Sequence, residues 1–132
     1  MYLHTQAGIE TGPRTSLLSD DRYELYWEGT IFFPGHTEGE PSMRELLSHL
    51  RNDSSNNALS SSIQGLCGNW VLFIHDRRDK TWAALADHSH QSFLFYSPDA
   101  VSNSFLRLRT DRKDKAAVMD ESMLSFLYCG SC

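Results

Sequence analysis

The sequence predicts an α+β fold, in which antiparallel strands form sheet layers and helices pack against them. Two β-like segments follow one another within residues 69–86, separated by a polar break. A capping-box pattern and helically spaced apolar residues lie upstream, within residues 42–51. The chain has 132 residues, of which 40% are hydrophobic and 22% charged, as is typical of one compact domain. We therefore expect a single domain over residues 1–132.

The first third of the chain contains two strand signals. Met1–Ile9 has a weak one, and Tyr23–Trp27 alternates in a β manner and is rich in aromatic residues. The β pattern resumes at Ile31–Phe33, so we expect a bulge or bend at Gly29 that interrupts this strand.

A short amphipathic helix is predicted from about residue 42 to residue 51. Ser42 and Glu45 have the spacing of a capping box, in which each side chain binds a free backbone amide of the first turn. The apolar residues at helical spacing are Met43, Leu46, Leu47 and Leu50. The Ser/Asn-rich stretch 52–62 is expected to be a loop that runs into a helical turn.

The second half of the chain predicts an antiparallel meander. Asn69–His75 is apolar on both faces, which indicates a central strand covered from both sides. A hairpin loop then leads to a returning strand at Thr81–Ala86, and further strands are expected at Phe93–Tyr96 and Ser104–Arg109. The last expected element is a helix over Asp120–Cys129.

The charge balance argues against some classes of partner. Acidic residues number 17 against 12 basic ones, giving a net charge of −5, whereas a nucleic-acid surface needs a basic stripe. No segment has the apolar length of a membrane span or the pattern of a signal peptide. We expect a cytoplasmic protein that binds neither nucleic acid nor membrane.

The three cysteines, an odd number, do not indicate a disulfide framework. Cys67 precedes a strand and is interpreted as a small buried hydrophobic residue. Cys129 and Cys132 have the spacing of a redox or zinc motif, but no second pair completes four ligands. This motif is interpreted as the end of the last helix.

Asp87, His88 and His90 form a polar break between two apolar segments. Two histidines two residues apart on a strand would share a face, but a third metal ligand would have to come from a distant residue such as His36 or His75. A polar turn is the preferred interpretation. The sequence contains no Gly-rich phosphate loop, GxSxG elbow or HExxH motif, so no metal and no cofactor are expected.

The segment from residue 59 to residue 96 carries a family resemblance. Gly68–Asp76 matches the pattern l-G-x-F-A-F-x-x-x-D, and Leu85–Tyr96 matches l-a-R-D-x-x-G-x-x-P-L-Y-Y, with Asp87 at the aspartate of R-D. These patterns resemble the glutaminase domain of asparagine synthetases, the class II or N-terminal-nucleophile (Ntn) type of glutamine amidotransferase. The resemblance implies an Ntn-hydrolase-like, reduced αββα arrangement and, for an intact member, the activity of a glutamine-hydrolysing asparagine synthetase.

Two further segments extend the likeness. Residues 119–130 resemble the helix by which such chains enter the synthetase domain, so 119–132 is expected to be the start of that junction. Trp27–Phe33 is similar to a degraded form of the family's y-N-G-E-I-Y-N.

The residues that the family uses for catalysis are missing here. Its nucleophile is a cysteine directly after the initiator methionine, whereas this chain has Tyr2, which should also prevent removal of Met1. The N-G-E that holds glutamine and the oxyanion reads Glu28-Gly29-Thr30, and a carboxylate at position 28 would repel an oxyanion. The segment before Glu28 is also too short for the family's R-G-P-D. The sequence therefore predicts no glutaminase activity.

Three hypotheses follow. The first is a non-catalytic glutaminase-like domain that acts as a structural, docking or regulatory module for an asparagine-synthetase-like, ATP-dependent amide-forming ligase, supplied in cis or in trans. The second is an active hydrolase or metal-dependent enzyme that uses Cys67 or the pair His88 and His90. The third is a self-associating structural domain, a homo-oligomer, in which an edge strand is left exposed by its aromatic residues. These residues are Tyr26, Trp27, Phe32 and Phe33.

Overall fold

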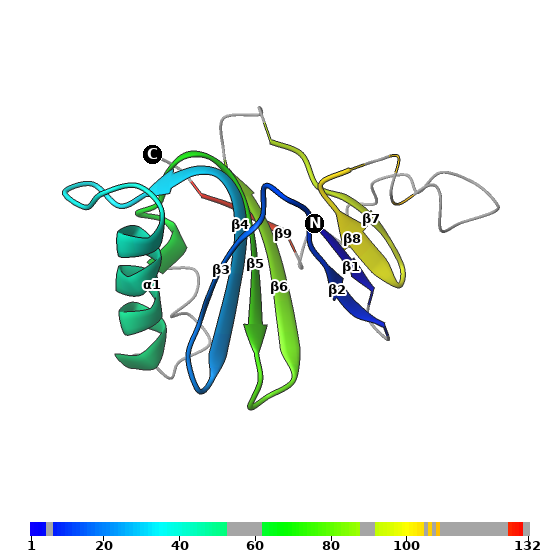
Figure 1. The fold of residues 1–132 in the computed structure, drawn as a ribbon, viewed down its shortest axis with the longest axis horizontal. Helices are drawn as coiled ribbons and strands as arrows, with labels where there is room; N and C mark the ends of the chain where they lie inside the picture. Colours follow the sequence, from blue (N-terminus) through cyan, green and yellow to red (C-terminus); the bar gives the residue numbers. More distant parts are fainter. Residues whose placement is uncertain are drawn as a thin grey trace.

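The computed structural model describes residues 1–4, 7–52, 62–87, 92–104, 106 and 108, together with the backbone of residues 127–130. Figure 1 shows these residues in three layers: a helix, a larger sheet and a smaller sheet. The larger sheet is the middle layer, so it has one face toward the helix and one toward the smaller sheet. The α+β class predicted from the sequence is confirmed.

The larger sheet has five strands in the order β3-β4-β5-β6-β9. Their bounds are Ser16–Ser19 (β3), Tyr23–Phe32 (β4), Cys67–Asp76 (β5), Thr81–Asp87 (β6) and Leu127–Gly130 (β9). The first four pair in antiparallel fashion, and β9 pairs in parallel with β6. This sheet contains the predicted hairpin of residues 69–86.

The smaller sheet has four antiparallel strands in the order β2-β1-β8-β7. Their bounds are Tyr2–His4 (β1), Gly8–Glu10 (β2), Phe95–Ser97 (β7) and Ala100–Ser102 (β8). The sheet therefore joins the start of the chain to a segment about a hundred residues later, with β1 in its interior. The weak strand signal of residues 1–9 corresponds to the hairpin of β1 and β2.

The helix α1 (Glu40–Asn52) covers one face of the larger sheet (Figure 1). Its apolar side is buried against alternate residues of β4 and β5, because residues two apart on a strand face the same way. The helix supplies Met43, Leu46, Leu47 and Leu50, and the strands supply Leu25, Trp27, Ile31, Trp70, Leu72 and Ile74. Ile63 and Leu66 complete this core from the turn before β5.

The capping-box interpretation of Ser42 is wrong. The helix begins two residues earlier, at Glu40, and Ser42 is fully buried. Its hydroxyl accepts a hydrogen bond from the Phe33 N–H at 3.0 Å and donates one to the Thr37 carbonyl at 2.7 Å. Pro41 follows the first helical residue, where its missing N–H costs nothing, so the helix starts without help from Ser42.

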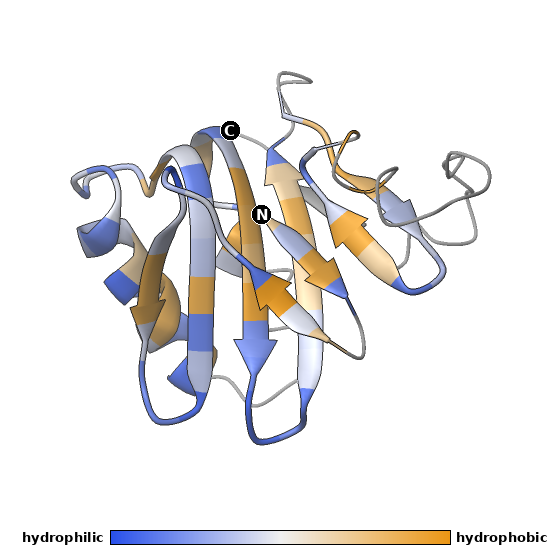
Figure 2. Ribbon diagram, turned by 45° about the vertical axis from the view of Figure 1, so that its right-hand side comes forward, coloured by the Kyte–Doolittle hydropathy of each residue, from blue (hydrophilic) through white to orange (hydrophobic). Residues whose placement is uncertain are grey.

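Opposite faces of the larger sheet pack against different layers. Phe73 and Val71 of β5 contact the smaller sheet, while Leu72 of the same strand contacts α1. Strand β5 lies between β4 and β6. This confirms the prediction of a central strand covered on both faces. Figure 2 shows hydrophobic colouring along β5 and β6 and in the smaller sheet.

Strand β4 runs through Gly29 without a break, contrary to the interruption expected there. Gly29 has φ +93°, and Gly68 on the neighbouring strand has φ +111°. The two glycines flank the paired residues Thr30 and Asn69. The chain thus bends at Gly29, as expected, but the pairing with β5 continues because both strands bend at the same place.

Three predicted strand features are corrected. The strand expected at Phe93–Tyr96 begins two residues later, as β7 (Phe95–Ser97), because the turn at Pro98 and Asp99 fixes its pairing with β8. Ser104–Arg109 is not a strand in its described part: the Leu108 N–H donates to the Ser104 carbonyl at 3.2 Å, and β8 is already paired on both sides. Strand β4 is an interior strand, so its aromatic residues do not leave an edge exposed.

The helix predicted over Asp120–Cys129 is wrong for the residues of it that the structure describes. Residues 120–126 lie outside the described residues, and Leu127–Gly130 forms a strand. The pairing of β9 with β6 gives the outer edge of β6 its hydrogen-bond partners. A run of leucine, tyrosine and cysteine fits a strand as well as a helix end.

Candidate functional site

The N-terminal residue and position 28 meet between the two sheets. The Met1 amine lies 3.0 Å from Glu28 Oε2 and donates a hydrogen bond to Asn103 Oδ1 at 2.8 Å. The Asn103 amide in turn donates to Glu28 Oε2 at 2.6 Å. These three groups form a closed ring of ammonium, carboxylate and amide, which we call the amino-terminal site.

Strand pairing brings the three residues together. Strand β1 pairs with β8, so that Tyr2 lies opposite Ser102 and Asn103 comes directly beside Met1. The Met1 carbonyl accepts hydrogen bonds from the Ser102 hydroxyl at 2.7 Å and from the Asn103 N–H at 3.3 Å. Glu28 shares the face of β4 that is turned away from α1, since Trp27 beside it packs against the helix. The site is therefore fixed by both sheets.

The chemistry of this site follows from its charges. An amine acts as a general base only through its nitrogen lone pair. Here the nitrogen is an ammonium that donates to Glu28 and Asn103, and the Glu28 side chain is only 18% exposed. The arrangement binds the chain end in place and offers no donor toward a developing oxyanion from position 28.

Tyr2 faces away from the amino-terminal site. It belongs to a small buried cluster with Ala100 and Leu108, whereas its neighbour Leu3 packs between the sheets. Alternation along β1 therefore places the side chain of position 2 on the outer face of the smaller sheet. The predicted nucleophile position is a buried aromatic residue.

The other positions of the degraded motif, Gly29 and Thr30, lie beside Glu28 on β4. A Cβ atom at Gly29 would collide with the Asn69 carbonyl, and one at Gly68 would collide with the Thr30 carbonyl. Both positions thus need glycine for the close approach of the two strands. Gly29 therefore has a backbone role in this fold.

Asp87 ends β6 and is buried. Its Oδ1 atom accepts a hydrogen bond from the Trp70 N–H at 3.1 Å, which joins β6 to β5. His88 and His90 lie outside the described residues, so the turn proposed for them stays a prediction. No group of three or more potential metal ligands lies together in the part of the chain that the structure describes.

Cys67 is buried, as predicted, but it is not a free thiol. Only 4% of the residue is exposed, and its sulfur is held in a disulfide. The odd number of cysteines did not indicate a disulfide framework, and a count cannot show which cysteines the fold brings together. A sulfur in a disulfide is not available as a thiolate nucleophile, which disfavours the Cys67 hydrolase hypothesis.

A second polar cluster was not predicted as a site. The His75 Nδ1–H donates to Glu24 Oε1 at 2.8 Å, and the Tyr26 hydroxyl donates to Glu24 Oε2 at 2.7 Å. The His75 ring stacks on Trp82 with 4.2 Å between ring centroids, and Arg77 lies 3.2 Å from Glu24. This Glu24 cluster occupies the end of the larger sheet on its smaller-sheet side.

Two groups of the Glu24 cluster, Glu24 and Tyr26, have shifted pKa values. Partial burial opposes ionisation of Glu24, but the hydrogen bonds from His75, Tyr26 and Arg77 outweigh it and lower the pKa of that carboxyl. Burial first, and then the Glu24 carboxylate, raises the pKa of Tyr26 to about 12. The sequence signal was the spacing of Glu24 and Tyr26 on one face of a strand; the register that adds His75 could not be read from it.

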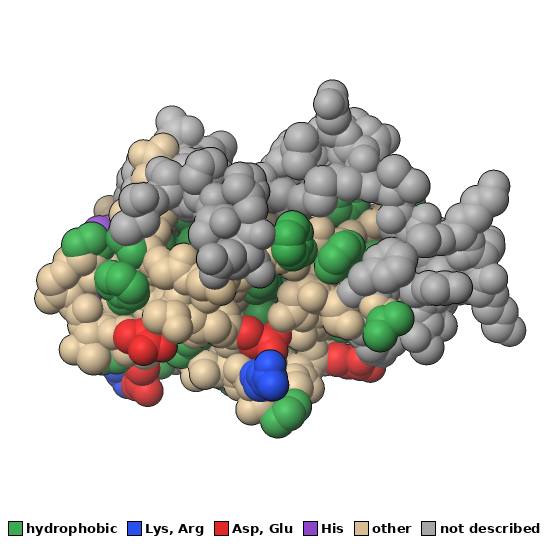
Figure 3. All heavy atoms as spheres, turned by 90° about the horizontal axis from the view of Figure 1, so that it is seen from above, with side chains coloured by type: hydrophobic (Ala, Val, Ile, Leu, Met, Phe, Trp, Pro, Cys, Tyr) green, Lys and Arg blue, Asp and Glu red, His purple; other side chains and the backbone are tan. Residues whose placement is uncertain are grey.

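The described part of one face can be checked for a basic stripe. Figure 3 shows one face of the molecule, on which the described acidic side chains lie in separate groups with few basic side chains beside them. No helix in the described ranges is long and apolar enough to cross a membrane.

No family model matches this chain, and no curated protein or solved structure is significantly similar to it.

Proposed function

We propose that this chain is a non-catalytic glutaminase-like domain of the Ntn type that serves as a structural, docking or regulatory module for an ATP-dependent amide-forming ligase. The ligase is of the asparagine-synthetase-like kind and lies either further along the same chain or in a separate protein. The proposal rests on the sequence likeness together with the arrangement of the amino-terminal site.

The observation that carries the proposal is the ion pair between the Met1 amine and Glu28, at 3.0 Å. In the sequence likeness, position 28 falls on the asparagine of the motif that holds the oxyanion. Met1, which precedes the first strand, lies against this position, and this supports the proposal. The groups present, an ammonium and a carboxylate, neutralise each other instead of forming a base and an oxyanion donor.

The layer order gives further support. The described layers are helix, sheet and sheet, in which the smaller sheet contains the N-terminal strand in its interior. Such an order is compatible with an αββα arrangement reduced by one helical layer, although sheet layers of this kind serve many functions. Tyr2, buried on the outer face of the smaller sheet, supplies no nucleophile.

The partner follows from the family chemistry that the resemblance implies. An asparagine-synthetase-like ligase adenylates a carboxylate with ATP, releases pyrophosphate, and then lets an amine displace AMP to form an amide. A ligase that takes its amine from another source, as in the biosynthesis of a peptide or other natural product, has no use for glutamine hydrolysis. In this proposal such a ligase keeps the glutaminase-like domain for a structural, docking or regulatory role alone.

Two measurements test this proposal together. First, the purified protein is assayed for ammonia release from glutamine, beside its Glu28→Gln variant. We expect no release from either protein. Second, the protein is purified natively from its source by size-exclusion chromatography with light scattering, and any co-eluting protein is identified by mass spectrometry and assayed for carboxylate-dependent pyrophosphate release from ATP.

Co-elution with an ATP-dependent, pyrophosphate-releasing ligase, or recovery as part of a longer chain that contains one, supports the proposal. Glutamine hydrolysis by the isolated protein overturns its non-catalytic part. Recovery without any such ligase activity overturns its docking part and separates this fold from the function of the family it resembles.

A further inference from the structure

Among the described residues, strand β3 is an unprotected edge of the larger sheet. It pairs with β4 on one side and ends the sheet on the other (Figure 1). Leu17 is 54% exposed, and Ser16 and Ser19 are exposed as well. Natural edge strands are usually blunted by charged residues, proline or a bulge, and residues 16–19 contain none of these.

The hairpin register shows which backbone groups of β3 point outward. The Asp20 N–H donates to the Tyr23 carbonyl at 2.9 Å, so these two residues form a hydrogen-bonded pair. Such pairs recur at every second residue of an antiparallel ladder. Leu18 with Leu25 and Ser16 with Trp27 are therefore the next ones, which leaves the N–H and C=O groups of Leu17 and Ser19 directed away from β4.

We propose that β3 is a self-pairing edge, at which two copies of this chain join their larger sheets in antiparallel fashion about a two-fold axis through Leu17. Leu17 then lies opposite Leu17 of the second copy, and each residue donates its N–H to the carbonyl of the other. Ser19 of one copy lies opposite Thr15 of the second. This inference is independent of the proposed function.

Charge complementarity selects a second copy as the occupant of this edge. Arg14, just before β3, is exposed and has no hydrogen bond or ion pair with any described residue. Asp21, just after β3, is 88% exposed and forms an ion pair with the half-exposed Arg51. Antiparallel pairing places the Arg14 turn of each copy at the Asp20–Asp21 turn of the other, so the same favourable contact forms twice. Parallel pairing would place like charges together.

The first test is molar mass by light scattering over a series of protein concentrations. A four-residue strand buries less area than a typical stable interface, so we expect a dimer that dissociates on dilution. Leu17→Lys should weaken association by about tenfold or more, because two lysines would meet at the axis. The matched control is Phe93→Lys, at another exposed apolar residue, and should not change association. Circular dichroism checks that both variants keep the fold.

The second test reverses charges. Arg14→Glu and Asp21→Arg should each weaken the dimer, because each places like charges across the interface. The double variant Arg14→Glu/Asp21→Arg should associate more strongly than either single variant, because the opposite charges face each other again. If the two substitutions weakened association only by disturbing the structure of each copy, their effects would add, and the double variant would associate more weakly than either single variant.

The third test fixes the axis. Opposing residues in a hydrogen-bonded antiparallel pair have Cα atoms about 5.5 Å apart, which suits a disulfide. Leu17→Cys should give a disulfide-linked dimer under mild oxidation, in which mass spectrometry identifies the peptide that joins the two introduced cysteines. Ser19→Cys should not, because it faces Thr15. A monomer at every concentration, a dimer unaffected by Leu17→Lys, or a crosslink formed by Ser19→Cys in place of Leu17→Cys would overturn the proposal.

Discussion

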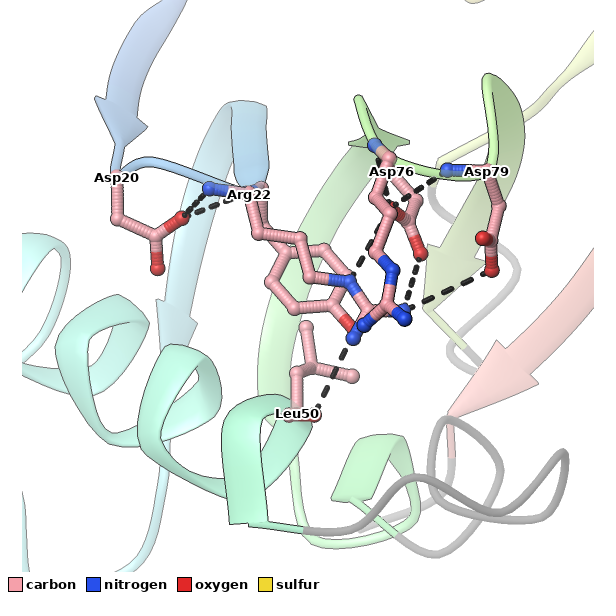
Figure 4. Close-up of polar contacts among 7 residues, drawn as sticks. Asp20, Arg22, Leu50, Asp76 and Asp79 are labelled. Atoms are coloured by element: carbon pink, nitrogen blue, oxygen red, sulfur yellow. Dashed lines mark hydrogen bonds and ion pairs between the residues drawn. The ribbon is translucent and has the colours of Figure 1, made fainter.

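The guanidinium of Arg22 donates two hydrogen bonds to the carboxylate of Asp76, at 3.2 and 2.9 Å. Figure 4 shows the arginine reaching from the β3–β4 turn to the end of β5, with Asp79 beside it. Asp76 also accepts the N–H groups of Arg78 and Asp79 at 3.0 and 3.3 Å, which shapes the β5–β6 turn. One ion pair therefore fixes two successive hairpin turns against each other.

Replacing Arg22 by lysine should lower the melting temperature, because a lysine ammonium cannot form the two parallel hydrogen bonds of a guanidinium. The Arg22 hydrogen bonds, which outweigh partial burial, lower the pKa of Asp76. In the variant this pKa should move back toward the ordinary value of 3.8, as an NMR titration can follow. Arg44→Lys, in an exposed ion pair with Glu40, serves as the control and should leave both quantities unchanged.

Acid should destabilise this protein through three carboxyl groups. The pKa values of Asp20, Glu24 and Asp76 are lowered in the folded state from ordinary values of 3.8, 4.5 and 3.8. For Asp20, burial is outweighed by the backbone hydrogen bonds of Tyr23 and Arg22 and by the charge of Arg51. As the pH falls, these three carboxyl groups therefore bind protons at a higher pH in the unfolded chain than in the folded chain, which favours unfolding.

The stabilisation from these carboxylates is complete above about pH 5 and is lost as the pH falls through the lowered pKa values. Urea unfolding at a series of pH values should show the midpoint decline below this pH. Asp76→Asn should flatten the decline while lowering the midpoint at neutral pH. A midpoint that stays constant down to about pH 3 would contradict the assignment.

Gly29→Ala and Gly68→Ala should each destabilise the fold by at least about 2 kcal/mol, because the new Cβ atom meets a backbone carbonyl and the backbone has a positive φ. Gly12→Ala is the matched control, since a Cβ there meets no atom within 4 Å. Chemical denaturation measures all three. Equal stabilities of the three variants would show that the two strands separate easily at Thr30 and Asn69.

Ser42→Ala should cost about 1 to 3 kcal/mol, because it leaves the buried Phe33 N–H and Thr37 carbonyl without their shared partner. Ser48→Ala, on the exposed side of α1, should have little effect. Glu45→Ala distinguishes this role from a capping box, in which Glu45 would matter as much as Ser42. A large loss of helix stability with Glu45→Ala would restore the capping interpretation.

Tyr26 should ionise far above the ordinary tyrosine value of 10.0, at a pKa of about 12. Because this pKa is raised by folding, its contribution to stability is present below pH 10 and is lost as the pH rises toward 12. Ultraviolet absorbance titration, with Tyr26→Phe to assign the signal, measures the value. Glu24→Gln should lower it without restoring the ordinary value, since burial is the larger cause.

Local patterns in the sequence correctly predicted the elements that lie in the helix-covered core. Leu46 and Leu50 repeat at helical spacing, and Trp70, Leu72 and Ile74 alternate along a strand, so each element carries its own buried face. The central position of β5 could be predicted because its two faces are both apolar. The resemblance to glutaminase domains likewise comes from this local pattern.

The sequence by itself determined the α+β class, the helix near residues 42–51 and the β5–β6 hairpin. Only the tertiary structure decided that Met1 meets Glu28 and Asn103, that His75 meets Glu24, and that Cys67 is in a disulfide. The contacts of Met1 and His75 join residues far apart in the chain, and they depend on strand register and on which sheet each strand enters. The capping role predicted for Ser42 and the helix predicted at Leu127–Gly130 were wrong for the same reason. The local sequence at these positions does not show which parts of the chain will contact them in the fold.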